Sequence, residues 1–198
     1  GYVVNIGADM KSSYNSIKLA EKYDFVYASV GVHPHEAISV KEEDYKTLEN
    51  WLQQEKVVAL GEIGLDFYYD FSPRDIQRQV FQRQLKICEN ITKPVIIHSR
   101  EASQEVVQAY SGSLEMALEY IKLGFYIGVG GVLTFKNANK LLNVVENIPL
   151  EHILIETDSP YLAPVPVRGT RNNSQNLKYI VEKISEIKQI EPEKVEKI

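Results

Sequence analysis

The hydrophobic positions of this chain fall into short continuous runs rich in β-branched residues, separated by longer segments in which apolar and polar positions recur with a helical period. Buried parallel strands are typically continuous apolar runs, whereas the helices that connect them are amphipathic. The pattern therefore predicts a parallel sheet with crossover helices. Six segments are predicted to be strands: Tyr2–Ala8, Val26–Val32, Val57–Leu65, Pro94–His98, Tyr126–Gly130 and Ile153–Thr157.

Seven segments between and after these runs are predicted to be helices: Ser13–Lys22, Glu42–Glu55, Arg74–Asn90, Ala102–Tyr110, Leu114–Lys122, Asn137–Asn147 and Ser174–Lys188. The third shows the period most clearly, with one apolar stripe formed by Ile76, Val80, Phe81, Leu85 and Cys88. No Gly, Ser or Pro-rich linker divides the chain. We therefore expect one α/β domain over residues 1–198, either a closed (β/α)8 TIM barrel or a doubly wound sheet.

The strand count falls short of a full barrel. A (β/α)8 barrel has eight strands and about 250 residues, and the predicted strands are two fewer. The chain begins on a strand, and it stops inside the helical pattern Pro192–Ile198. The predicted helix that ends at Tyr110 runs directly into Ser111–Ser113, which is typical of a helix N-cap, with no strand between. We expect a barrel that lacks its first strand, its sixth strand region and its C-terminal end.

The composition narrows the class of protein. With 44% hydrophobic and 25% charged residues among 198, the chain is a globular protein that buries a core without disulfides. Cys88 is the only cysteine, which excludes an intramolecular disulfide and a cysteine-based zinc site, and we expect it to be a buried thiol. No signal peptide or membrane-spanning run is found, so the expected location is cytoplasmic, with no membrane association and no obligate protein partner.

The net charge of −5 argues against a general nucleic-acid coat, whose surface would be basic. It does not exclude a metal-dependent phosphodiesterase, because bound divalent cations supply positive charge where the phosphate lies.

Polar residues interrupt the apolar pattern at the ends of four predicted strands. In an α/β fold the carboxyl ends of parallel strands meet at one edge, where active sites form. The four strand ends are Gly31–His35, Gly61–Asp66, Ile96–Arg100 and Ile155–Pro160. Their Glu, His and Asp side chains are the ligands of a divalent-metal hydrolase. Glu62, His98 and Asp158 are the leading candidates.

Each candidate also has a purely structural interpretation. Glu62 could pair with a lysine, His98 could be a core histidine, and Asp158 could cap the turn before Pro160. His33 and His35 flank a proline, which is common in turns. Their occurrence together at four strand ends favours a functional site, because a charge at the end of a buried strand is costly without a partner or a metal.

Several longer motifs carry a resemblance to a known family. They are Gly61–Asp66, Ser72–Arg74 with Gln77, Arg78, Phe81 and Gln84, then Pro94–Arg100, Ser111–Ser113, Gly124–Ile127 and Glu156–Pro164. In order and spacing, over essentially the whole chain, they resemble the TatD family of metal-dependent deoxyribonucleases. The resemblance implies a TIM-barrel hydrolase of the amidohydrolase-like kind that cuts phosphodiester bonds in DNA with two divalent ions.

The resemblance also implies roles for individual residues. Glu62 would be the carboxylate shared by the two ions, His98 an imidazole ligand, and Asp158 a ligand that can also orient or deprotonate the attacking water. Glu62 and Asp158 are therefore the expected catalytic residues. His33, in a Gly-Val-His-Pro motif, resembles a residue that contacts the phosphate or substrate. The ions would be Mg, Zn or Mn.

Cationic and aromatic side chains near the carboxyl ends of the predicted strands, where the active site is expected, suggest how DNA is bound. Arg100, Arg168 and Arg171 are candidates for binding phosphates, although solvated surface positions would also explain them. The aromatic residues either stack on unpaired bases or cover the end of the barrel. They are Phe67, Tyr68, Tyr69 and Tyr161. The expected partner is DNA, single-stranded or at its ends.

Two family features are not found in this sequence: a His-x-His pair on the first strand and a His-Cys before the Ser-Gly-Ser at Ser111. Both fall where the strand pattern is already incomplete. If the chain ends and joins as written, weak or no metal binding is expected. Two alternatives follow: hydrolysis of an amide or ester at the same metal centre, and a catalytically silent barrel acting as a scaffold.

Overall fold

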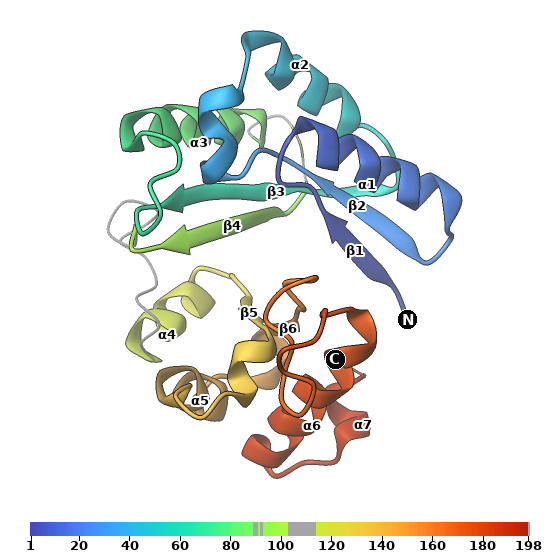
Figure 1. Cartoon of the computed structure of the whole chain (residues 1–198), viewed down its shortest axis with the longest axis vertical. Helices are drawn as coiled ribbons and strands as arrows, with labels where there is room; N and C mark the ends of the chain where they lie inside the picture. The colour runs from blue at the N-terminus through green and yellow to red at the C-terminus, as the bar shows by residue number, and fades with distance from the viewer. Residues whose placement is uncertain (89–90, 92, 103–113, 198) are drawn as a thin grey trace. The chain divides into compact units, whose positions relative to one another are not determined.

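The computed structural model describes residues 1–88, 91, 93–102 and 114–197. It divides the chain into two compact units, Gly1–Ala109 and Tyr110–Ile198, each built from parallel strands and helices (Figure 1). The expectation of one domain over residues 1–198 stays a prediction. None of the helices in the described ranges combines the length and apolar character that crossing a bilayer requires.

The first unit contains a sheet of four parallel strands in the order β1-β2-β3-β4. The strands are β1 (Val3–Ile6), β2 (Val26–Val30), β3 (Val57–Asp66) and β4 (Val95–Arg100). Three helices cover one face of the sheet (Figure 1): α1 (Met10–Lys22), α2 (Glu42–Trp51) and α3 (Arg74–Cys88). A short 3-10 helix, η1 (Pro34–Ser39), follows β2. The chain order equals the spatial order, as consecutive strand-helix-strand units predict.

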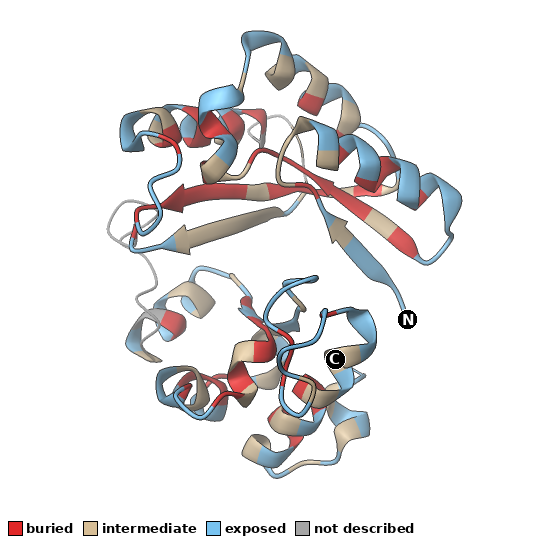
Figure 2. Ribbon diagram, viewed as in Figure 1, coloured by how far each residue is buried: buried red, intermediate tan, exposed pale blue. Residues whose placement is uncertain are grey.

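The most buried part of this unit is its central strands, β2 and β3 (Figure 2). Val30, Leu60 and Ile63 are fully buried, which agrees with the continuous apolar runs of the sequence. Helix α3 places the predicted Val80 and Phe81 in the core. The side chain of Cys88 lies outside the described residues, so its burial stays a prediction.

Helix α1 begins three residues earlier than the sequence pattern indicates. Asp9 accepts a hydrogen bond from the backbone N–H of Ser12, and the Ser12 hydroxyl accepts one from the backbone N–H of Asp9. This reciprocal capping satisfies two donors at the helix start. The polar Asp9 and Ser12 therefore set the boundary, where the apolar period alone placed it at Ser13.

The second unit contains two parallel strands, β5 (Ile127–Val129) and β6 (Ile153–Ile155). Four helices accompany them: α4 (Leu114–Lys122), α5 (Asn139–Asn147), α6 (Leu177–Lys188) and α7 (Pro192–Val195). Single 3-10 turns lie at Gly131–Thr134, Leu150–His152 and Ser174–Asn176. Val129, Val144 and Ile180 belong to one buried apolar cluster that joins these elements.

All six predicted strands are confirmed, and no strand end differs from its prediction by more than two residues. Six of the predicted helices correspond to α1 to α6, and the terminal helical pattern to α7. The predicted helix Ala102–Tyr110 lies, apart from Ala102, outside the described residues, as do the Ser111–Ser113 segment and its junction with Tyr110.

Candidate metal centre

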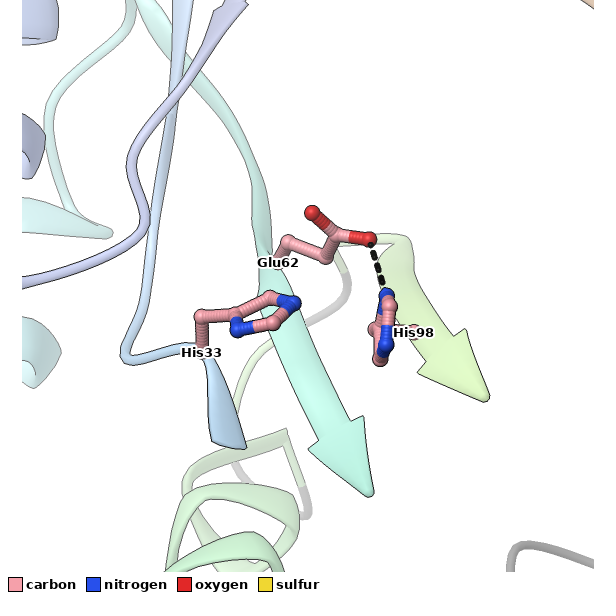
Figure 3. Close-up of side chains that lie close together, drawn as sticks. All are labelled: His33, Glu62 and His98. Atoms are coloured by element: carbon pink, nitrogen blue, oxygen red, sulfur yellow. Dashed lines mark hydrogen bonds and ion pairs between the residues drawn. The ribbon is translucent and has the colours of Figure 1, made fainter. Parts of the chain in front are cut away.

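Three side chains from neighbouring strands of the first unit meet at one place. His33 follows β2, Glu62 lies in β3 and His98 lies in β4. One ligand atom from each lies within 4.8 Å of the other two, and all three residues are partly buried (Figure 3). Imidazole nitrogens and a carboxylate oxygen are the donors that zinc, manganese and similar divalent ions take in proteins. The residues therefore fit a divalent cation.

The approach of β4 to β3 depends on a glycine. Gly64 pairs with His98 in the sheet, and a Cβ on Gly64 would lie 2.0 Å from the backbone oxygen of His98. Its φ of +140° is also a conformation that other residues rarely adopt. Gly64 thus allows the strand that carries His98 to lie against the strand that carries Glu62.

Glu62 and His98 interact directly. The Nδ1 atom of His98 donates to Oε1 of Glu62 over 3.2 Å (Figure 3). Burial raises the pKa of Glu62, but the hydrogen bond and the charge of His98 outweigh it, so the net pKa is lowered. Burial lowers the pKa of His98, and the carboxylates of Glu62 and Asp66 reverse this to a raised pKa. The two side chains therefore stabilise each other's charged form at the position of the candidate ligand atoms.

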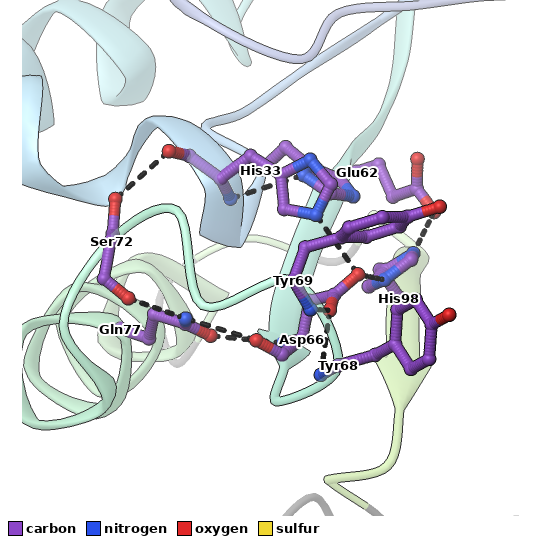
Figure 4. Close-up of polar contacts among 9 residues, drawn as sticks. His33, Glu62, Asp66, Tyr68, Tyr69, Ser72, Gln77 and His98 are labelled. Carbon is purple, nitrogen blue, oxygen red and sulfur yellow. Dashed lines mark hydrogen bonds and ion pairs between the residues drawn. The ribbon is translucent and has the colours of Figure 1, made fainter.

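Asp66, at the end of β3, holds the other side of this histidine. Its Oδ2 atom accepts from Nε2 of His98 at 3.0 Å and from Nε2 of His35 at 2.9 Å. Its Oδ1 atom accepts the backbone N–H groups of Tyr68 and Tyr69, each at 3.0 Å (Figure 4). The Asp66 side chain is 1% exposed.

Burial alone would raise the pKa of Asp66, but the bonds from Tyr69, His35 and His98 lower it to about 2. The carboxylate is therefore ionised and fixes the Nε2–H of His98, so that Nδ1 faces Glu62. Carboxylates that orient metal-binding histidines in this way are typical of metal sites. Asp66 belongs to the strand-end motif recognised in the sequence, but the sequence alone assigned it no role.

His33 has a different environment. Its Nδ1 accepts the backbone N–H of His35 at 3.2 Å, and the rings of His33 and His98 are 4.3 Å apart, edge to face. Burial, followed by the charge of His98, lowers the pKa of His33 to about 4. The ring is therefore neutral at pH 7, and with Nδ1 as acceptor its proton lies on Nε2. That N–H is a donor suited to an anionic oxygen, and the contact of His33 with substrate stays a prediction.

Two buried glutamines of α3 fix the ends of β2 and β3. The Gln84 side chain accepts the backbone N–H of Val32 at 2.8 Å and donates to its carbonyl oxygen at 3.0 Å. Gln77 does the same for the backbone of Asp66, at 2.9 and 3.0 Å (Figure 4). These residues position His33 and Asp66 through the main chain. The sequence analysis quoted both glutamines in the family motif and missed this role, although polar residues seven apart on the apolar face of an amphipathic helix are a usable signal.

The remaining predicted site residues are distributed over both units. In the first, the Arg100 guanidinium lies 4.3 and 4.7 Å from the ring centres of Tyr68 and Tyr69. In the second, Asp158 is exposed after β6, and Arg168 lies 3.9 Å from the ring centre of Phe135. Arg171 is exposed. The roles given to these residues in metal or substrate binding stay predictions, as does the number of ions.

A second pair of carboxylates ends β6. Glu156 and Asp158 are both exposed, and they lie beside the glycines of the neighbouring strand. A Cβ on Gly128 would lie 3.2 Å from the Glu156 carboxylate, and one on Gly130 would lie 3.7 Å from Oδ2 of Asp158. Gly128 therefore leaves room for the Glu156 carboxylate, whereas a side chain at Gly130 would make only an ordinary contact with Asp158.

Comparison with known proteins gives consistent results. The family model described as TatD related DNase matches residues 1–198. The chain is 40% identical to YabD of Bacillus subtilis (strain 168), an uncharacterised metal-dependent hydrolase, over 99% of this chain and 83% of that protein. It is 34% identical to YcfH of Escherichia coli (strain K12), also an uncharacterised metal-dependent hydrolase, over 91% of this chain and 73% of that protein.

Solved structures agree with these matches. The crystal structure of YjjV, a TatD homologue from Escherichia coli K12, superposes with a TM-score of 0.90 at 28% identity, covering 98% of this chain and 82% of that chain. A TatD family hydrolase from Entamoeba histolytica has the same fold, with a TM-score of 0.85 at 23% identity over 98% of this chain and 80% of that one. The predicted fold class, an α/β barrel of the TatD kind, is confirmed. The chain therefore belongs to the TatD family of metal-dependent hydrolases.

Proposed function

We propose that this protein hydrolyses phosphodiester bonds in DNA, with two divalent metal ions at the carboxyl ends of the strands. The observation that carries the proposal is the cluster of His33, Glu62 and His98, whose nitrogen and oxygen atoms lie within 4.8 Å of one another, with Glu62 and His98 as the metal ligands and His33 as the donor to the substrate. Membership of a family whose model is described as TatD related DNase supports the choice of substrate.

Different residues of the chain would bind the cation, accept a proton and contact the phosphate. Glu62 and Nδ1 of His98, once Nδ1 has given up its proton, would hold a cation, while Asp66 retains the Nε2 proton of His98 and keeps the ring in place. When bound, the ions polarise the phosphate and lower the pKa of water. Asp158 would complete the ligand set and accept a proton from the attacking water. The Nε2–H of His33 would donate to a phosphate oxygen.

Cationic side chains would hold the DNA around the reacting phosphate. Arg100, Arg168 and Arg171 supply this positive charge in a protein whose net charge is −5. Guanidinium groups match phosphate geometry through paired N–H donors. We propose DNA that is single-stranded, or frayed at its ends, as the substrate.

The test uses the full chain, stripped of metal with a chelator and reloaded with Mg, Mn or Zn. Metal-dependent cleavage of a labelled single-stranded oligonucleotide is expected. Removing the base with Asp158→Asn should lower turnover by about 100-fold or more. Asp24→Asn, at an exposed aspartate of the α1–β2 connection, is the matched control.

Three outcomes contradict parts of the proposal. Undiminished turnover in Asp158→Asn removes that residue from the mechanism. Cleavage of small amides or esters without cleavage of DNA moves the function to another bond at the same centre. A protein that binds no divalent ion in excess metal is a scaffold and not a hydrolase.

A further inference from the structure

An aromatic surface lies directly beside the candidate metal centre. It consists of Tyr68, Tyr69 and Phe71, in the connection between β3 and α3, and these residues are 54%, 46% and 65% exposed. Three large rings exposed within four residues form a contiguous apolar patch. Such patches on soluble proteins mark binding surfaces more often than scattered single residues do.

The rings are ordered relative to one another. Tyr69 and Phe71 are stacked, with ring centres 5.3 Å apart and planes at 15°. His35 lies edge-on to both, at 5.6 Å from Tyr69 and 4.8 Å from Phe71. The two nearly parallel rings form a stacked platform, and a third planar ring can extend the stack on an outer face, where Phe71 is the more exposed of the two.

The platform is tied to the candidate metal centre by Asp66. The same Oδ2 atom accepts from His35, which lies against the platform, and from His98, which is a candidate ligand. The Oδ1 atom fixes the backbone of Tyr68 and Tyr69 (Figure 4). The positions of the rings and of His98 are therefore set by one buried carboxylate.

Arg100 adds a positive charge to this surface. Its guanidinium lies over the rings of Tyr68 and Tyr69, at 4.3 and 4.7 Å from their centres. A guanidinium stacked on aromatic faces keeps its N–H groups directed outward in the plane of the group. The surface thus combines flat apolar rings with a cation, which fits a planar uncharged ring linked to a phosphate.

We propose that the platform of Tyr69 and Phe71 binds an unpaired nucleobase of the DNA next to the phosphate that is cut, while Arg100 contacts a neighbouring phosphate. This subsite rests on the proposed function. A base within a duplex has both faces covered by its neighbours, so only an unpaired base can stack here. The platform would therefore make the enzyme prefer single strands and frayed ends.

The experiment measures binding and cleavage with two labelled oligonucleotides of equal length. One is an ordinary single strand and the other carries deoxyribose phosphates without bases, so both have the same charge. With a chelator present to prevent cleavage, Phe71→Ala should weaken binding of the ordinary strand by about 5- to 100-fold and leave binding of the abasic strand unchanged. Phe71→Tyr should restore binding, because it keeps the ring.

The matched control is Phe25→Ala, at a phenylalanine that is 51% exposed in the α1–β2 connection. It should change binding of neither strand. An equal loss on both strands with Phe71→Ala, or no loss on either, overturns the stacking subsite.

Restoring the metal separates this inference from the proposed function. A metal-loaded wild-type protein that cleaves neither strand contradicts the proposed function, whatever the binding result. Cleavage of the ordinary strand that is insensitive to Phe71→Ala contradicts only the stacking subsite.

Discussion

Two strands of this protein carry a pair of carboxylates, one pair within β3 and the other just after β6, and the pairs differ in environment. At the end of β3, Asp66 is buried and Glu62 partly buried, and both are hydrogen-bonded to His98. After β6, Glu156 and Asp158 are exposed beside Gly128 in β5 and Gly130, which follows β5. Burying a carboxylate requires partners, and in the first unit the partners are histidines that can also bind metal. The oxygen atoms of the first pair are therefore already held in position, while the second pair is accessible to solvent.

The largest expected effect tests this difference directly. Replacing Glu62 with Gln should weaken binding of zinc or manganese by about a thousandfold, the share of one ligand in a metal site. Asp158→Asn should weaken it by about tenfold, because an exposed carboxylate is less fixed before binding. Isothermal titration calorimetry on the full chain measures both. Exposed Glu43→Gln in α2 is the control, and equal losses in the two test variants would break the comparison.

The next largest expected effect is on stability, through the glycines that lie beside the two pairs of carboxylates. Gly64→Ala should lower the free energy of unfolding by about 3 kcal/mol, because its Cβ would meet the backbone of His98 at a φ of +140°. Gly128→Ala should change it by about 1 kcal/mol or less, because the nearest atoms to its Cβ belong to the exposed side chain of Glu156, at 3.2 Å, and not to backbone. Urea denaturation measures both, and similar values for the two variants would contradict the distinction.

Removing the charge of Asp66 should have a smaller effect on metal binding. Asp66→Asn should weaken binding by about 10- to 100-fold, the range for residues that orient ligands. Nitrogen NMR of the imidazoles supplies a second readout, because His98 should lose its fixed Nε2 proton. A variant with full affinity and an unchanged His98 spectrum would show that Asp66 does not orient this ring.

The smallest expected effect is on the free energy of unfolding at acid pH. The pKa of Asp66 is lowered from 3.8 to about 2, so its contribution is present above pH 4 and is lost as the pH falls through 2. The loss should be about 2 kcal/mol in the free energy of unfolding. Asp66→Asn should lack this portion of the acid dependence. The test is denaturant unfolding at pH 4, 3 and 2, and parallel curves for the two proteins would contradict it.

The sequence predicted the strands and named all three members of the cluster, Glu62 and His98 as metal ligands and His33 as a substrate contact, for a clear physical reason. Continuous apolar runs locate buried parallel strands, and their carboxyl ends converge, so Glu62 and His98 could be placed together before any coordinates. The partners of these residues depend on details that periodicity does not carry. Whether Asp66 reaches His35 and His98 depends on the register of β3 against β4 and on side-chain rotamers. The stacking of Arg100 on the tyrosines depends on the same details.

The role of the glutamines of α3 could not be predicted either, because the function of a buried polar side chain on an apolar helix face depends on its hydrogen-bond partner. Gln77 and Gln84 are seven residues apart, which is about 10 Å along the helix axis. Each forms hydrogen bonds with the main chain at the end of a different strand. Helix α3 therefore acts as a spacer of fixed length between the two strand ends. A displacement of α3 would therefore move both strand ends together, and with them His33 and Asp66.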